Sequence, residues 1–182
     1  ATEVRRVATT VRGTMGEPTI IVNNAGAFAL GELGALSLAD AERMVQVNLL
    51  APYHLLHHLL PGMRERRRGH VVMVGSIADH TAFPENAAYA ASKYGARAIH
   101  EVLCAELRGS GVRATLVSPG PVDTAMWDSV GLEHRKGFPA RAEMLGAEDV
   151  ADAVLWAVTR PPHVQVDEVR VGSIGRRGTS DG

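Results

Sequence analysis

A serine, a tyrosine and a lysine are spaced in this sequence so that they could move a proton to or from an oxygen atom. Ser76 follows an apolar, strand-like run, Tyr89 comes 13 residues later, and Lys93 lies four residues beyond Tyr89. In a helix, Tyr89 and Lys93 would be about one turn apart and would share a face. A phenol has a pKa of about 10 in water, and a neighbouring cation lowers that pKa toward neutrality. With Ser76 binding the same oxygen, the pattern predicts a proton-transfer site for a carbonyl or an alcohol.

A tyrosine four residues before a lysine is common on helices, and alone it more often marks a solvated lysine beside a half-buried tyrosine. Two features favour chemistry here. Lys93 is one of two lysines against seventeen arginines, and a compact ammonium is not interchangeable with a planar guanidinium. Ser76 also stands at the end of a predicted strand, where the loops of α/β sheets carry function.

Further motifs lie on either side of these three residues. The sequence Asn-Asn-Ala-Gly occupies residues 23–26, and Pro-Gly-Pro-Val-Asp-Thr occupies residues 119–124. In this order, and collinearly to about residue 174, the motifs resemble the short-chain dehydrogenase/reductase family. The resemblance implies an NAD- or NADP-dependent oxidoreductase that transfers a hydride between nicotinamide and an alcohol or a ketone.

The resemblance also implies a role for each matching residue. The catalytic tetrad would be formed by Ser76, Tyr89, Lys93 and Asn48. The asparagine would hold a water that links the lysine to solvent. Contacts with the cofactor would come from two loops and from the catalytic helix, through Asn24, Ala25, Gly26, Tyr89, Lys93, Pro119, Gly120, Val122 and Thr124.

Pro52 gives a separate reason to expect a water near Asn48. A helix is predicted from Leu38 to about Arg66, and Pro52 lies inside it. Proline has no N–H, so the carbonyl of Asn48, four residues earlier, loses its helical partner. A buried carbonyl needs a substitute partner, and water is the obvious one. The alternative is a structural kink with Asn48 packed nearby.

Composition narrows the classes of protein. A chain of 182 residues with 46% hydrophobic content fits one domain with a core. The net charge of −1 argues against a nucleic-acid partner, and no apolar run of about 18 residues suggests a membrane span. The one cysteine, Cys104, fits a reducing compartment, so a cytoplasmic location is expected. Three histidines, at 54, 57 and 58, lack acidic or cysteine partners at ligand spacing, so no metal site is predicted.

Alternating helical and strand-like patterns predict the architecture. Such alternation is typical of an α/β fold with a doubly wound, Rossmann-like parallel sheet. Residues 125–146 mix apolar side chains with charges and glycines, which fits a substrate lid or a poorly ordered surface loop. The expected helices are 1–13, 38–66, 86–108 and 148–159, and the expected strands are 19–22, 71–74, 112–117 and 169–171.

One motif of the family does not occur in this sequence. The family begins with a strand and a glycine-rich phosphate loop of the TGxxxGxG kind, which these residues do not contain. The chain is therefore expected to be the C-terminal portion of the fold, with residues 1–174 as a partial domain and 175–182 as a disordered tail. Residues 161–169 resemble a branch that often uses NADP, so NAD or NADP is expected, with NADP slightly favoured.

Two functions remain open at this point. The first is an oxidoreductase acting on a small alcohol or carbonyl substrate, and the resemblance implies a homo-oligomer, either a dimer or a tetramer. The second is a truncated, catalytically inactive module of the same fold that serves binding or oligomerisation. The second follows from the absent phosphate loop, because a helix N-terminus normally holds the cofactor diphosphate.

Overall fold

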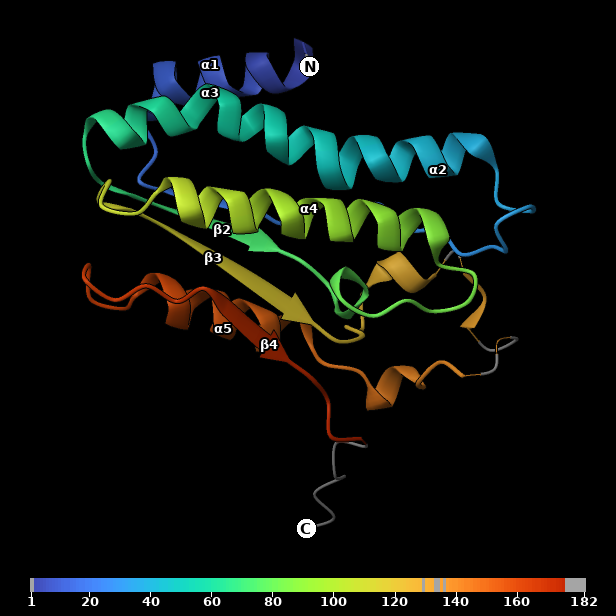
Figure 1. The fold of residues 1–182 in the computed structure, drawn as a ribbon. Coiled ribbons are helices and arrows are strands. Elements are labelled where there is room, and N and C mark those ends of the chain that lie inside the picture. The colour runs from blue at the N-terminus through green and yellow to red at the C-terminus, as the bar shows by residue number, and fades with distance from the viewer. Residues whose placement is uncertain (1, 129, 133–134, 136, 176–182) are drawn as a thin grey trace.

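Four parallel strands form one sheet in the order β1-β2-β3-β4 (Figure 1). This computed structural model describes every residue except 1, 129, 133–134, 136 and 176–182. In β2, Val71 lies opposite Ile21 of β1 and Ala114 of β3. The sheet confirms the predicted parallel α/β fold, and each strand lies within two residues of its predicted place: β1 (Ile20–Asn23), β2 (Gly69–Val74), β3 (Val112–Pro119) and β4 (Glu168–Val171).

Helices cover both faces of this sheet. Helix α1 (Thr2–Met15) packs on α3 (Ala51–Glu65), and α3 lies beside α4 (Ala87–Glu106) on one side of the sheet (Figure 1). Helix α5 (Ala147–Val158) lies on the other side, against β3 and β4. The main core fills the space between α3, α4 and the sheet with side chains that include Leu56, Leu59, Met63, Val71, Met73, Leu103 and Leu116. Because α4 rests on this core, it holds its side chains in fixed positions relative to the strand ends.

The long helix predicted from Leu38 to about Arg66 is interrupted by a π-helical segment. It consists of α2 (Leu38–Val45), a π-helix (Gln46–Leu50) and α3. At the junction the Ala51 N–H donates to the carbonyl of Gln46, five residues back. Pro52 cannot donate a hydrogen bond, and its ring would crowd the carbonyl four residues earlier, so a local widening of the helix accommodates it. The widened turn contains Asn48.

The described residues of the segment 125–146 have little regular structure. They include the short 3₁₀ turns Ala125–Trp127 and Arg141–Glu143. Met144 is buried, and Leu145 pairs with Val122 in an isolated bridge. The segment is thus anchored at its C-terminal end on the loop that follows β3.

Two further expectations concern the chain ends and the membrane. The predicted disordered tail, residues 175–182, falls outside the described residues except for Gly175. Among the helices that the structure describes, none combines the length and the apolar character needed to cross a membrane.

Candidate active site

The predicted site residues gather at one edge of the sheet, where β1, β2 and β3 end. Residues 24–26 follow β1, Ser76 follows β2 by two residues, and Pro119 is the last residue of β3. Parallel strands place their carboxyl ends at the same edge, which is where open α/β sheets bind ligands. The sequence motifs therefore converge because the three strands are adjacent and parallel.

Ser76 is held at this edge by the backbone around it. The Gly75 N–H donates to the carbonyl of Val117 at 2.8 Å, which extends the pairing of β2 with β3. Ser76 then caps a short 3₁₀ turn (Ile77–Asp79), and its Oγ accepts from the Ala78 N–H at 3.2 Å. The Ser76 side chain also lies close enough to the phenol of Tyr89 to lower the pKa of that phenol. The serine and the tyrosine are therefore neighbours, as the proton-transfer hypothesis requires.

Tyr89 and Lys93 lie one turn apart on α4, facing the strand ends. Both side chains are buried, with 9% and 7% of their surface exposed. The Lys93 ammonium donates to the carbonyl of Val74 at 3.0 Å and stands 5.7 Å from the centroid of the Tyr89 ring. Within the described residues, Val74 is the one hydrogen-bond acceptor of this ammonium, so two of its three N–H groups are available to a ligand.

Burial shifts the pKa values of both Tyr89 and Lys93. It raises the pKa of Tyr89 above its ordinary value, although the Ser76 hydrogen bond lowers it; the Asp79 charge adds to the rise. Burial also lowers the pKa of Lys93 to about 8, against the raising effect of Asp79. The sequence predicted that Lys93 would lower the pKa of Tyr89. In this structure the pKa of Tyr89 is raised instead, because desolvation of the phenolate outweighs the other effects.

Asn48 is buried beside the pair, and its side chain braces the loop after β1. Its Oδ1 accepts from the Ala27 N–H at 2.7 Å, and its Nδ2 donates to the Ala27 carbonyl at 2.9 Å. The same Nδ2 donates to Ser92 Oγ, which in turn donates to the carbonyl of Tyr89. The asparagine thus connects the loop at 24–27 with the turn of α4 that carries Tyr89. The relay water expected at its main-chain carbonyl remains a prediction.

A row of aromatic rings extends from Tyr89 into the segment after β3. Phe28 packs edge-on against Tyr89, with ring centroids 4.8 Å apart, and against Trp127 at 5.1 Å. Trp127 also packs against Phe138 at 6.0 Å, and its indole N–H donates to the carbonyl of Val122 at 2.8 Å. The sequence did not single out Phe28, because an aromatic residue five positions after β1 carries no motif. These rings give one side of the site an apolar wall.

The remaining cofactor positions lie on exposed or turning backbone. Asn24, Ala25 and Gly26 are exposed, and the Gly120 N–H donates to the carbonyl of Val171 in β4 at 2.8 Å. Thr124 precedes the 3₁₀ turn Ala125–Trp127, where its carbonyl accepts from the Trp127 N–H at 3.2 Å. The exposed loop after β1 and the spare N–H groups of Lys93 fit a ligand that carries hydroxyl and amide groups, as a nicotinamide riboside does.

Sequence comparison identifies a family for most of the chain. The profile of the short chain dehydrogenase family matches residues 1–135. An uncharacterised oxidoreductase of Staphylococcus epidermidis is 33% identical over 156 residues, which cover 86% of this chain and 65% of that protein. The chain therefore spans about 65% of the length of this relative.

Solved structures agree with the sequence comparison. Serine dehydrogenase from Escherichia coli is 28% identical with a TM-score of 0.77, and the match covers 92% of this chain and 69% of that one. An alcohol dehydrogenase from Thermococcus sibiricus, complexed with 5-hydroxy-NADP, is 26% identical with a TM-score of 0.83. That match covers 96% of this chain and 71% of the archaeal one.

Proposed function

The chain belongs to the short-chain dehydrogenase family, and on that premise we propose that it forms the catalytic portion of an NAD(P)-dependent oxidoreductase. The reaction is hydride transfer between a nicotinamide and a small alcohol or ketone. The observation that carries this proposal is the gathering of Ser76, the buried Tyr89 and Lys93 at the carboxyl edge of the sheet.

Each of these side chains has a task that follows from its surroundings. Ser76, whose side chain lies close enough to the phenol to lower its pKa, is placed to hold a substrate oxygen next to Tyr89. Because burial raises the pKa of Tyr89, the phenol keeps its proton at neutral pH and is ready to donate it. In carbonyl reduction, Tyr89 would protonate the oxygen that becomes the alcohol.

Lys93 and Asn48 support the tyrosine. Lys93, with a pKa of about 8, is mostly charged at neutral pH, and its positive charge stabilises the phenolate left after proton transfer. Asn48 fixes the loop at 24–27 against α4 and, in this proposal, holds the water that returns a proton to the site.

The residues fit a nicotinamide nucleotide, whose bound form would supply or accept the hydride. Asn24, Gly26, Lys93 and Thr124 would hold its nicotinamide and ribose portion. The archaeal relative complexed with 5-hydroxy-NADP supports NADP as the cofactor. The chain spans about 65% of the length of a curated relative. The oxidoreductase activity of the whole protein is therefore also a proposal.

We also propose that the protein is a homo-oligomer. Tyr53 of α3 and Tyr94 and Val102 of α4 are exposed by 54%, 44% and 57%. Large apolar side chains on two neighbouring helices would be covered in an association between copies of this chain.

An activity measurement separates the enzyme from the inactive module. The chain is assayed alone and as a fusion in which the glycine-rich nucleotide-binding segment of a relative precedes residue 1. NADPH binding is followed by fluorescence, and NADPH oxidation is followed with a panel of aldehydes and ketones. The enzyme proposal predicts turnover by the fusion, and it predicts neither binding nor turnover by the chain alone. A fusion that binds NADPH but oxidises it with no carbonyl compound would instead support the module.

A further inference from the structure

Asp79 is a fully buried carboxylate with four hydrogen-bond donors. Its Oδ1 accepts from His80 Nδ1 at 2.7 Å and from Arg97 Nη1 at 3.2 Å. Its Oδ2 accepts from the Ser76 N–H at 3.1 Å and from the Ser118 hydroxyl. An ionised carboxylate can accept about four hydrogen bonds, so this set uses its whole capacity.

Gly75 leaves room for the Asp79 carboxylate, because glycine has no side chain. A methyl group on Gly75 would collide with Asp79 Oδ2 and would come within 2.9 Å of Ser118 Oγ. Any residue other than glycine would displace either the carboxylate or the strand end. The close approach of Gly75 therefore brings Asp79 directly against the backbone that presents Ser76.

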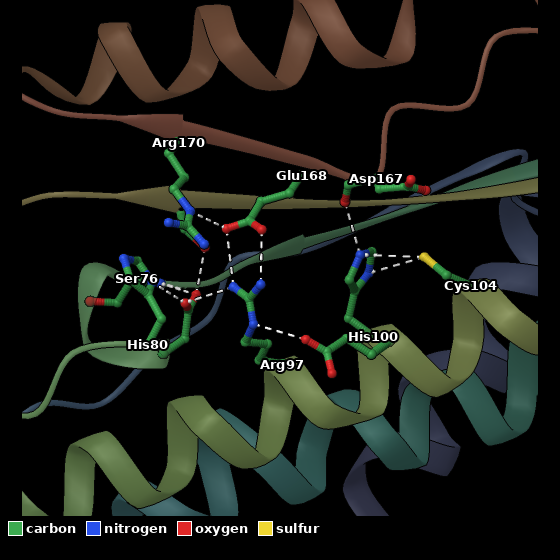
Figure 2. Close-up of polar contacts among 11 residues, drawn as sticks. Ser76, His80, Arg97, His100, Cys104, Asp167, Glu168 and Arg170 are labelled. Atoms are coloured by element: carbon green, nitrogen blue, oxygen red, sulfur yellow. Dashed lines mark hydrogen bonds and ion pairs between the residues drawn. The ribbon is translucent and has the colours of Figure 1, made fainter.

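Arg97 of α4 connects Asp79 with β4. Its guanidinium donates to Glu168 at 3.0 and 2.8 Å as well as to Asp79, and Figure 2 shows it directed at the Glu168 carboxylate. Glu168 also accepts from Arg170 (Figure 2). These contacts raise the pKa of Arg97 and lower that of Glu168 to about 2, so both groups stay charged over a wide range of pH. The Asp79 carboxylate is thus clamped by a permanent cation that is itself anchored on the last strand.

The same cluster does not form a metal site. Ligand atoms of Asp79, His80 and Glu168 lie within 4.8 Å of one another. Arg97 donates to two of these three residues, and Arg170 donates to Glu168. The Arg97 guanidinium therefore already supplies the positive charge that a metal ion would bring to these carboxylates.

We propose that Asp79 is a positioning residue of the active site: its carboxylate, clamped by Arg97, holds the Ser76 backbone in place and balances the charge of the buried Lys93 ammonium. The proposal rests on the function proposed above for Ser76, Tyr89 and Lys93. In this proposal, Asp79 makes no direct contact with the substrate oxygen or with Tyr89. It acts through Ser76, to which it is bonded, and through its charge.

Asp79→Asn gives the most direct test, because it keeps the shape and removes the charge. The carboxamide accepts at one oxygen only, and its NH₂ group faces donors that occupied the other oxygen. The groups that face the carboxylate are His80, Arg97, Ser118 and the Ser76 N–H, with Glu168 and Arg170 behind Arg97. Among the charged groups of the site, Lys93 loses an anion that favours its protonated form.

The first readout does not depend on activity. Lysine carrying ¹³C at the ε position is incorporated, and NMR follows the two lysines of the chain with pH, while Lys136→Arg assigns the signals. We expect Asp79→Asn to lower the pKa of Lys93 below its value of about 8 in the unaltered chain. The matched control is Glu101→Gln, which removes a more exposed ion pair of the same arginine and should leave Lys93 unchanged.

A second variant covers the case in which Asp79→Asn does not fold. Arg97→Gln removes the cation that partly neutralises Asp79, so the pKa of Lys93 should be no lower than in the unaltered chain. The proposal is overturned if Asp79→Asn folds with an unchanged Lys93 titration, or if Arg97→Gln lowers the pKa of Lys93.

The second readout uses the active fusion. Asp79→Asn should lower kcat by roughly 10-fold or more with little change in the KM for NADPH, since Ser76 acts on the reacting oxygen. Glu101→Gln should keep kcat. An unchanged kcat in Asp79→Asn would overturn the positioning role. If the fusion shows no turnover while Lys93 responds as expected, the proposed function fails and the electrostatic role of Asp79 stands.

Discussion

The ammonium of Lys93 donates a hydrogen bond to the main-chain carbonyl of Val74, 3.0 Å away. This contact ties α4 to the end of β2 two residues before Ser76. The strand that delivers the serine and the helix that delivers the tyrosine are therefore fixed to each other by the lysine itself. Lys93 has a structural task as well as an electrostatic one, so its replacement should disturb both.

The phenol of Tyr89 should titrate above free tyrosine in the chain without ligand. Burial of the phenolate raises the pKa of Tyr89, and the nearby charge of Asp79 adds to that rise. Absorbance is followed with increasing pH in the unaltered chain and in Tyr89→Phe, and the difference isolates this phenol from the exposed Tyr53 and Tyr94. A difference titration with a midpoint below about 10 would show that Lys93 outweighs desolvation even without a ligand.

Glu168 should make the protein sensitive to acid. Its pKa is lowered from 4.5 to about 2, first by hydrogen bonds from Arg97 and then by those from Arg170. Between these two values the unfolded chain binds more protons, so this contribution to stability is complete above 4.5 and is lost as the pH falls toward about 2. We expect Glu168→Gln to reduce the free energy of unfolding at neutral pH by about 1.5–3 kcal/mol, measured by urea titration.

The loss in Glu168→Gln should also shrink as the solution becomes more acidic. Glu101→Gln is the control, because Glu101 pairs with the same arginine but is more exposed. Equal losses in the two variants, or a loss in Glu168→Gln that does not depend on pH, would contradict this role.

His70 should contribute a second pH dependence at milder acidity. Burial lowers its pKa from 6.5 to about 4, and Arg113 adds to the effect. Its Nε2 bonds with Thr115 Oγ1 at 2.8 Å, and the threonine donates to Val166, so a neutral histidine fits as the donor. Because the folded pKa is depressed, stability is complete above 6.5 and is lost as the pH falls toward about 4.

Thermal melts at several pH values test the role of His70. The variant His70→Gln retains a donor for Thr115 but has no imidazole to titrate. Between pH values of about 4 and 6.5, the slope of its free energy of unfolding against pH should fall by the equivalent of about one bound proton. A slope that does not change would assign the acid sensitivity in that range to other groups, such as His100, whose pKa burial also lowers.

The sequence predicted the fold, and it placed the candidate site residues after neighbouring strands, because both depend on local patterns. Strands buried on both faces are nearly continuous apolar runs, and the motif residues follow those runs, so their meeting at one edge was implied by the parallel order. The π-helical turn around Asn48 was not predicted. The sequence indicated either a water at the Asn48 carbonyl or a structural kink, because Pro52 reveals a missing hydrogen bond but not how the helix adjusts.

The contacts that cross between elements were not predicted. Asp79, Arg97 and Glu168 lie in three different elements, and charges on separate elements carry no mutual spacing in the sequence. The direction of the pKa shift of Tyr89 also could not be predicted, since it depends on how completely the phenol is buried. Spacing identified the groups that meet, whereas burial decided their proton affinities.

If Tyr89 transfers the proton, the turnover of two tyrosine variants should differ sharply. Tyr89→Phe and Tyr94→Phe each remove one hydroxyl from α4, but Tyr94 is exposed and lies outside the site. In the NADPH-binding fusion, we expect Tyr89→Phe to lower kcat roughly 100- to 10,000-fold with nearly unchanged NADPH binding, and Tyr94→Phe to keep kcat. A kcat for Tyr89→Phe close to that of Tyr94→Phe would show that the proton comes from a group other than Tyr89.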